Sequence, residues 1–429
     1  MPVLKGKLLL PLLGALLLVG CQTSPPKPEA QVVEKPRPVQ RSLEQRWQDS
    51  ANRKQELESL ISRLQGAELR KHARKGAASP ATLEKTLARL EQARRYTRQA
   101  RDIVSALYGY RKAGGAAFET RWEQALWKRL GSSSKSADST PSEVNELDLL
   151  AARRSLAAQI AKAWFYEKGV RQLRQRADEV RDLYQQVLDR HRTSKQLERG
   201  NHDGLLATRK ELARVDGRAR QLQRAERLAH KALVVLTGNK GIRVEQKASV
   251  KPVPGGLPMP LLANRPDVYR SASALVEGGA ISGEPAQLLP ELPLTSKGGR
   301  PTRTLSRWSR YKPEKLQEAL NLPSGMEVQG EELEAFLETL VHALREVRGF
   351  LHVGRQLLGQ RSNLQSAQQE ARRQVNKLRA RYSARRADLT DILKAQIELA
   401  EIAGKLAYVQ NRVFGQRLDS YLALGGSGF

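Results

Sequence analysis

The sequence is poor in the residues that build disulfides, metal centres and aromatic cores. Of its 429 residues, one is cysteine, six are histidine and 5% are aromatic. A single cysteine excludes an intrachain disulfide framework, and histidines without ligand spacing offer no metal site. The sequence also lacks phosphate-binding loops, dinucleotide fingerprints and nucleophile motifs. We therefore expect no enzyme, no metal and no cofactor.

Charge of one sign is abundant instead. The chain has 74 Lys and Arg residues against 45 Asp and Glu residues, so its formal net charge is +29. A basic excess suits nucleic acid, anionic lipid or an acidic envelope polymer, and the compartment decides among them. Charged residues make up 28% of the chain, and Ala, Leu, Arg, Gln and Glu dominate long stretches. This composition favours long helices over mixed α/β domains.

The N-terminus predicts the compartment. Two lysines precede the apolar run Leu8–Val19, which is too short to span a bilayer as a mature helix. The run ends in Leu18-Val19-Gly20-Cys21, which resembles a bacterial lipobox. An ordinary buried cysteine is the alternative. We expect residues 1–20 to be a lipoprotein signal peptide and Cys21 to be the acylated first residue of the mature chain.

Residues 21–40 are expected to tether the body to the outer membrane. Five prolines lie between Gln22 and Gln40, and such a segment is stiff and extended, with a reach of roughly 60 Å at about 3.1 Å per residue. Gln22, in place of an aspartate, resembles an outer-membrane sorting signal. Loss of the signal peptide removes two lysines and no acid, which lowers the net charge from +29 to +27. Export argues against a nucleic-acid partner.

Residues 41–250 are expected to form the first helical-hairpin repeat. Helical periods cover Ser42–Arg74 and Ala81–Lys112, whereas residues 116–146 lack a clear pattern. Apolar residues then follow at alternating steps of three and four, which predicts a coiled-coil seam on a helix of about 45 residues, a rod about 70 Å long. The return helix is expected at Leu205–Leu236. The seam consists of Leu149, Ala152, Leu156, Gln159, Ala163, Tyr166, Val170, Leu173, Ala177, Val180, Tyr184 and Val187.

Residues 251–429 are expected to repeat this hairpin. A helix is predicted from Glu331 to about Arg381, and a partner helix ends near Leu424. The period of the duplication is about 190 residues, which is too long for a solenoid. The heptad positions of the partner helix are Ile392, Ala395, Leu399, Ile402, Leu406, Val409 and Val413.

The stretch between the repeats contains Arg265-Pro266-Asp267. Proline fixes φ where a helix begins, and Asp267 is well placed as an acid at the positive end of the helix dipole. Small residues follow and indicate close packing, until Pro290 ends the helix. These small residues are Ala272, Ala274, Gly278, Gly279, Ala280 and Gly283.

Four landmarks resemble TolC-like outer membrane factors, and most closely their NodT-type efflux lipoproteins. The tripeptide Arg265-Pro266-Asp267 is similar to the repeat junction of that family. The segment Arg381–Gln396 is similar to its RY-x-x-G-x-x-x-x-D-x-L-D-A-Q turn at the periplasmic tip, and Leu422–Gly426 resembles its closing A-L-G-G-G. With the lipobox at Cys21, the landmarks occur in family order over nearly the whole chain.

The resemblance implies a mainly α fold of two long coiled-coil α-hairpins. It further implies a homotrimer that closes into a hollow α-barrel and serves as a passive exit duct, with a periplasmic adaptor and an inner-membrane pump as partners. The alternative is a structural coiled-coil lipoprotein that binds peptidoglycan or anionic lipid through its basic surface.

The tips depart from the family pattern. Arg385 and Arg386 stand where the family has glycine in the second turn, and Lys394 occupies the place of its second acid. At the first tip, His191 occupies the tyrosine position and Gly200 is displaced. The candidate residues of the periplasmic tip or entrance are Arg190, His191, Arg381, Tyr382, Asp388, Asp391 and Lys394.

The segments that carry strand hairpins in the family are poor in strand signals here. A membrane strand needs about 9–11 residues that alternate apolar and polar. Residues 116–146 show no such alternation, and prolines interrupt residues 286–330. The stretch Arg300–Lys315 carries six Arg and Lys residues, which are costly in contact with lipid tails. We expect short, reduced or absent β-hairpins, attachment through the acyl chains at Cys21, and a basic segment that meets anionic headgroups or a partner.

Overall fold

The computed structural model describes residues 60–78, 83–109, 120–133, 146–197, 202–277, 284–320, 322 and 330–426. The signal peptide, Cys21, the tether, Gly200 and the glycines between residues 278 and 283 lie outside these ranges. The described residues belong to one compact unit, Arg41–Phe429. The division into repeats at residue 250 remains a prediction.

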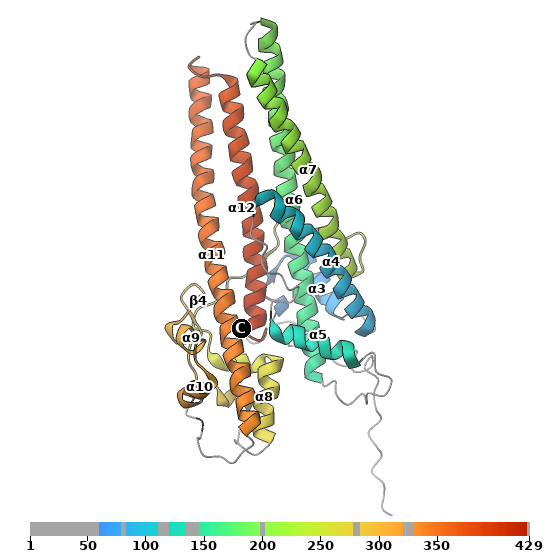
Figure 1. The fold of residues 1–429 in the computed structure, drawn as a ribbon, viewed down its shortest axis with the longest axis vertical. Helices are drawn as coiled ribbons and strands as arrows, with labels where there is room; N and C mark the ends of the chain where they lie inside the picture. Colours follow the sequence, from blue (N-terminus) through green and yellow to red (C-terminus); the bar gives the residue numbers. More distant parts are fainter. Residues whose placement is uncertain are drawn as a thin grey trace, which may run out of the picture. The chain divides into compact units, whose positions relative to one another are not determined.

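Four long helices form a single layer. They are α6 (Glu146–Leu197), α7 (His202–Thr237), α11 (Gly330–Ser383) and α12 (Leu389–Ala423). Helix α6 packs on α7 and α12, and α12 packs on α6 and α11, so the order across the layer is α7–α6–α12–α11 (Figure 1). Helices α7 and α11 are therefore its two edges. The predicted mainly α fold, with long helices packed in pairs, is confirmed.

The predicted seam of α6 is buried against both of its neighbours. Val180 and Val187 of α6 pack in one cluster with Val215 of α7 and with Leu393 and Ile397 of α12. All five side chains are buried. Burial of each such side chain contributes about 1.5–3 kcal/mol, so the heptad pattern stabilises the pairing of the two hairpins as well as each hairpin.

Shorter helices cover one end of this layer. Helix α3 (Ala67–Ala78) packs on α6, and α4 (Leu83–Tyr108) packs on α7. The continuous helix expected over Ser42–Arg74 is wrong in its described part, because the two-residue strand β1 (Leu64–Gln65) precedes α3. Gly66 separates them with φ +129°, a conformation that side chains with a Cβ rarely adopt.

The segment without a clear sequence pattern contains helix α5 (Arg121–Ser133). Trp122, Leu126 and Leu130 are spaced by four residues and are all buried. This spacing places them on one face of the helix, which packs against α6. A helical period was therefore present from Trp122 to Leu130 in a segment for which no pattern was predicted.

The strands of the described residues are two residues long. Strand β1 pairs antiparallel with β2 (Ser249–Val250), and β3 (Thr295–Ser296) pairs antiparallel with β4 (Arg300–Pro301). Two short helices follow, α9 (Arg303–Trp308) and α10 (Pro313–Ala319), and both pack on α11. The expectation of short strands is confirmed. Among the described helices, none is long and apolar enough to cross a membrane.

Candidate functional site at the repeat junction and the helical tips

The repeat junction is built around a fully buried arginine. Arg265 lies between a 3-10 turn, η2 (Met259–Asn264), and helix α8 (Pro266–Glu277). Its Nε donates to Asp267 Oδ1 at 3.0 Å, and its Nη2 donates to Asp267 Oδ2 at 2.7 Å. Nη2 also donates to Glu346 Oε2 of α11 at 2.9 Å, and Nη1 donates to the carbonyl of Ala423 at 3.1 Å.

This arrangement keeps the guanidinium charged. Burial would lower the pKa of Arg265, but the carboxylates of Asp267 and Glu346 raise it above its ordinary value. Asp267 also accepts a hydrogen bond from the Val268 N–H at 3.0 Å, as expected for an acid in the first turn. The tripeptide thus connects α8, α11 and the end of α12. These contacts stabilise the packing of the three helices at the repeat junction.

The closing Leu-Gly-Gly sequence ends α12 against the same junction. Gly425 and Gly426 have φ +92° and +70°, and the Gly426 N–H donates to the Tyr421 carbonyl at 2.8 Å, which is the pattern of a glycine C-cap. A Cβ on Gly425 would lie 2.8 Å from the Leu261 carbonyl oxygen. Arg154 Nη1 of α6 donates to the Gly425 carbonyl at 3.2 Å. Glycine is required here by both conformation and space.

A buried polar network lies beside the junction, and sequence reasoning missed it. Glu123 of α5 is fully buried and accepts hydrogen bonds from Thr120 Oγ1 at 2.9 Å, Ser155 Oγ at 2.6 Å and Gln159 Nε2 at 3.1 Å. Trp127 Nε1 donates to Ser155 Oγ at 2.9 Å. Three partners satisfy the carboxylate, so the network joins α5 to α6 through a buried, hydrogen-bonded acid.

An ion pair between Lys162 of α6 and Asp419 of α12 adds a second buried polar link. Burial raises the pKa of Asp419, and Lys162 opposes this rise. Both groups are held between the packed helices α6 and α12. Among the described residues, no group of His, Cys, Asp and Glu side chains could hold a metal ion.

The second tip contains a strained arginine. Helix α11 ends at Ser383, and Arg385 adopts φ +57°, the only positive φ of a non-glycine side chain among the described residues. The Arg385 N–H donates to the Tyr382 carbonyl at 2.9 Å, and the Arg386 N–H donates to the Arg381 carbonyl at 2.7 Å. These two bonds define a Schellman turn, whose left-handed position usually holds glycine. Arg385 therefore keeps the turn geometry at a cost in backbone strain.

Helix α12 begins immediately after this turn. Asp388 is its N-cap and accepts a hydrogen bond from the Thr390 N–H at 2.7 Å, which lowers the pKa of Asp388. Arg190 and His191, at the end of α6, make smaller contributions in the same direction. The charges of candidate residues on α6 thus act on the N-cap carboxylate of α12.

The remaining tip candidates are exposed. Tyr382 is 46% exposed, and Arg381, Asp391 and Lys394 are also exposed. Asp391 and Lys394 lie about one turn apart on α12. The tip and the junction are at opposite ends of this helix of 35 residues, about 50 Å apart, so the two groups of candidates form separate sites.

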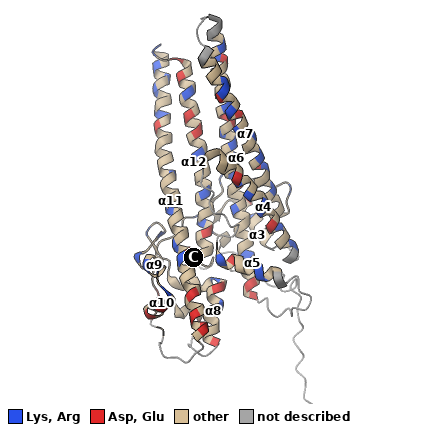
Figure 2. Cartoon of the chain, in the orientation of Figure 1, with Lys and Arg blue, Asp and Glu red and all other residues tan. Residues whose placement is uncertain are grey.

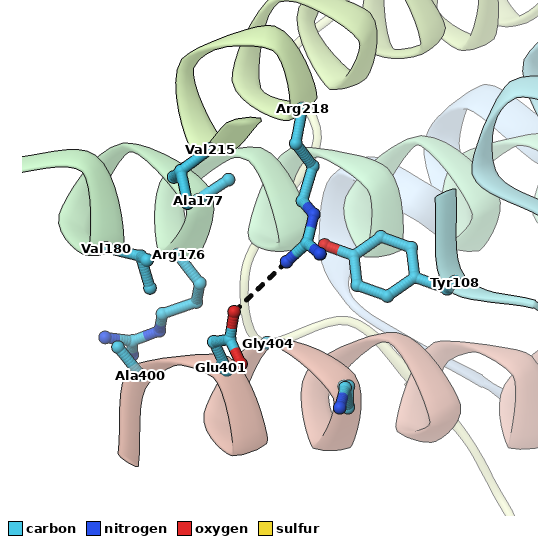
Figure 3. A pocket seen from close by; sticks show the side chains of 10 residues that line it. Tyr108, Arg176, Ala177, Val180, Val215, Arg218, Ala400, Glu401 and Gly404 are labelled. Atoms are coloured by element: carbon cyan, nitrogen blue, oxygen red, sulfur yellow. Dashed lines mark hydrogen bonds and ion pairs between the residues drawn. The ribbon is translucent and has the colours of Figure 1, made fainter. Parts of the chain in front are cut away.

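A small cavity lies where α4, α6, α7 and α12 meet (Figure 3). Arg218 Nη1 of α7 pairs with Glu401 Oε1 of α12 at 3.1 Å, and the guanidinium lies 5.5 Å from the centre of the Tyr108 ring. Burial raises the pKa of Tyr108 to about 12. The cavity has a volume of about 20 Å³, enough for about one water molecule, so it is not a ligand site. These partners are up to 293 residues apart, and no sequence pattern connects them.

Comparison with known proteins supports the fold and leaves the family open. No protein-family model matches the sequence, and no curated protein matches it significantly. Several solved structures do match. One is CusC, which has been described in terms of folding and transmembrane channel formation. Its TM-score is 0.65 at 18% sequence identity, over 84% of this chain and 96% of CusC.

Two further structures have the same arrangement. A membrane protein from Pseudomonas aeruginosa has a TM-score of 0.52 at 14% identity, over 87% of this chain and 93% of its own. The outer-membrane channel OprN has a TM-score of 0.51 at 14% identity, over 87% of this chain and 93% of OprN. The chain therefore has the fold of TolC-like outer membrane factors, at low sequence identity.

Proposed function

We propose that the chain is one subunit of a homotrimeric exit duct in an efflux or export system, of the NodT-type lipoprotein branch. The observation that carries the proposal is the four-helix layer, whose two edge helices, α7 and α11, are each only partly covered by shorter helices. An open helix layer can bury its edges against further copies, as a strand layer does when it closes. The fold is shared with OprN, which is an outer-membrane channel, and this likeness supports the proposed duct.

Exposed apolar side chains support contact at these edges. Among the described residues, four large apolar side chains are exposed, and three of them lie on the edge helices. Leu206 of α7 is 68% exposed, and Val353 and Tyr382 of α11 are 38% and 46% exposed. Leu206 and Tyr382 both lie within about two turns of the tips. We infer that α7 of one copy packs beside α11 of the next.

Cross-linking between engineered cysteines tests this packing. Within one chain, Leu206 and Tyr382 are separated by three helix spacings, roughly 25–30 Å, so a short cross-linker can join them only between copies. Leu206→Cys/Tyr382→Cys should give covalent dimers and trimers. Leu206→Cys/Val353→Cys is the control, because Val353 lies about 40 Å further along α11. Equal cross-linking in both variants, or monomers alone, would count against the proposed edge contact.

The proposed duct is anchored in the outer membrane by acyl chains at Cys21, with its body in the periplasm. Cys21→Ala should abolish fatty-acid labelling and release the chain from the membrane. An unchanged label in that variant would show that the lipobox interpretation is wrong. A periplasmic adaptor and an inner-membrane pump are the proposed partners at the tips.

The tip charges suggest how the entrance treats cations. Asp391 and Lys394 are exposed and about one turn apart, so their charges partly cancel in the assembled ring. We expect divalent cations to block the duct weakly and Lys394→Asp to increase the block. Strong block of the unmodified protein would contradict this placement of the two residues.

A further inference from the structure

A small folded segment beside α11 presents an unusual charged surface. Strands β3 and β4 lead into α9 and α10, and these helices pack on α11 through buried Leu305 and Leu316. Thr302 caps α9 by accepting the Leu305 N–H at 3.1 Å. Arg345 Nε of α11 donates to the Ser309 carbonyl at 3.1 Å. The segment is therefore held in place, and its surface side chains project from a fixed backbone.

The stretch from Lys297 to Lys312 carries only positive charge, and the exposed acids Glu314 and Glu318 of α10 follow it. No acid occurs between Glu291 and Glu314. The six basic side chains in this interval are all exposed, and none forms an ion pair with another described residue. They are Lys297, Arg300, Arg303, Arg307, Arg310 and Lys312, and we call them the basic surface.

On α6, by contrast, several arginines pair with acids of the same helix. Arg174 pairs with Asp178, Arg176 with Glu179, and Arg181 with Asp178. Figure 2 shows blue around α9, with red on the neighbouring α10. The basic surface thus combines an interval free of acids with a well-packed support.

We propose that the basic surface binds the phosphate groups of anionic lipid headgroups at a membrane. Guanidinium groups donate in a planar fork that matches phosphate oxygens, and four of the six residues are arginine. Unpaired cations beside an anionic membrane are attracted to it, and each strengthens partition about fivefold. The charges of the surface and of such a membrane are complementary.

The surroundings of the basic surface favour a membrane over a protein partner. Protein interfaces usually contain buried aromatic or aliphatic anchors. None of the exposed large apolar side chains among the described residues lies between residues 284 and 320, and Trp308 of α9 is buried in the core. Charge without an apolar anchor suits headgroups, which are bound without insertion.

The position of the basic surface along α11 is also compatible with binding to a membrane. Arg345, which holds the segment, lies 38 residues before the tip at Ser383, about 57 Å along the helix. The basic surface is thus at the end of the long helices away from the tips (Figure 1). In the proposed duct this end is the one nearest the outer membrane, but the binding of lipid does not require a duct.

Vesicle flotation tests the proposal in the absence of acyl chains. The full chain with Cys21→Ala should float with phosphatidylcholine vesicles that contain phosphatidylglycerol, and hardly at all with phosphatidylcholine alone. Adding Arg303→Gln, Arg307→Gln and Arg310→Gln should weaken partition about 100-fold, from the fivefold contribution of each cation. All three side chains are exposed, and a circular dichroism spectrum checks that the fold is kept.

A second triple variant controls for total charge. Arg372→Gln, Lys377→Gln and Arg379→Gln remove the same charge from the exposed distal part of α11, and should leave partition unchanged. Equal losses in the two triple variants would overturn the proposal in favour of non-specific attraction. Full vesicle binding by the first triple variant would also overturn the proposal and would favour an acidic protein as the partner of the basic surface. Neither result bears on channel conductance, so failure here is distinguishable from failure of the proposed duct.

Discussion

The turn at the second tip provides a sharp test, because two adjacent arginines should respond to the same substitution with opposite signs. Arg385 has φ +57°, whereas Arg386 is not in the left-handed region. A residue with a Cβ at a left-handed position costs roughly 1–2 kcal/mol, and glycine avoids this cost. Glycine also loses about 0.5–1 kcal/mol more backbone entropy on folding than other residues do.

The net effects follow from these two quantities. Arg385→Gly should stabilise the tip by about 0.5–1 kcal/mol, since the relief of strain exceeds the entropy cost. Arg386→Gly removes the same charge and relieves no strain, so it should destabilise the tip by about 0.5–1 kcal/mol. Both side chains are exposed, so lost packing contributes little to either variant.

Hydrogen exchange measures the opposite effects of Arg385→Gly and Arg386→Gly on the stability of the tip. It is followed on peptides from the end of α11 and the start of α12. Exchange in these peptides should slow about two- to fivefold in Arg385→Gly and accelerate by a similar factor in Arg386→Gly. Peptides from the repeat junction serve as the internal control and should not change. Faster exchange in Arg385→Gly, or the same direction in both variants, would refute the left-handed turn at Arg385.

Three further substitutions test the junction and the cap. Arg265→Met should lower the free energy of unfolding by about 3–5 kcal/mol, because two carboxylates lose their buried counter-charge, and a urea midpoint equal to that of the unmodified chain would contradict this. Gly425→Ala should destabilise far more than Gly109→Ala in the same assay: both glycines have positive φ, but a Cβ meets close atoms only at Gly425. Asp388→Ala should cost about 1 kcal/mol at neutral pH. Folding lowers the pKa of Asp388 below its ordinary value of 3.8, so its contribution to stability is present above pH 3.8 and is lost as the pH falls through the folded pKa. The urea midpoints of the unmodified chain and of Asp388→Ala should therefore converge in acid. A pH-independent difference would exclude the charged cap.

The long helices were predictable because their pattern is local. The seam from Leu149 to Val187 repeats every seven residues, and this period alone specifies a helix and the face that it buries. The prediction placed this helix within the observed Glu146–Leu197, and the return helix within His202–Thr237. Few alternative folds satisfy heptads of this length.

The polar contacts of the junction were not predictable in the same way. The tripeptide at Arg265 was recognisable, but its partners Glu346 and Ala423 are 81 and 158 residues away. The same holds for Glu123, whose partner Ser155 lies 32 residues further along the chain. Such contacts depend on how the helices cross, which periodicity does not specify.

The tip shows a third relation between sequence and structure. The sequence showed arginine at position 385, where the resemblance implies glycine, and gave no conformation for the turn. The structure keeps the Schellman hydrogen bonds and places Arg385 in the left-handed region. Tertiary packing of α11 on α12 determines the turn here, and the local preference of arginine is overridden.

The claim that copies of this chain form a duct is tested most directly by single-channel recording. The purified, acylated protein is added to a planar lipid bilayer, and the current is measured at fixed voltage. A duct predicts discrete, reproducible steps of current. The variant Leu206→Cys/Tyr382→Cys, purified in the same way, should yield covalent trimers. A folded, membrane-bound protein that gives no current steps would contradict the duct and favour a tethered coiled-coil rod.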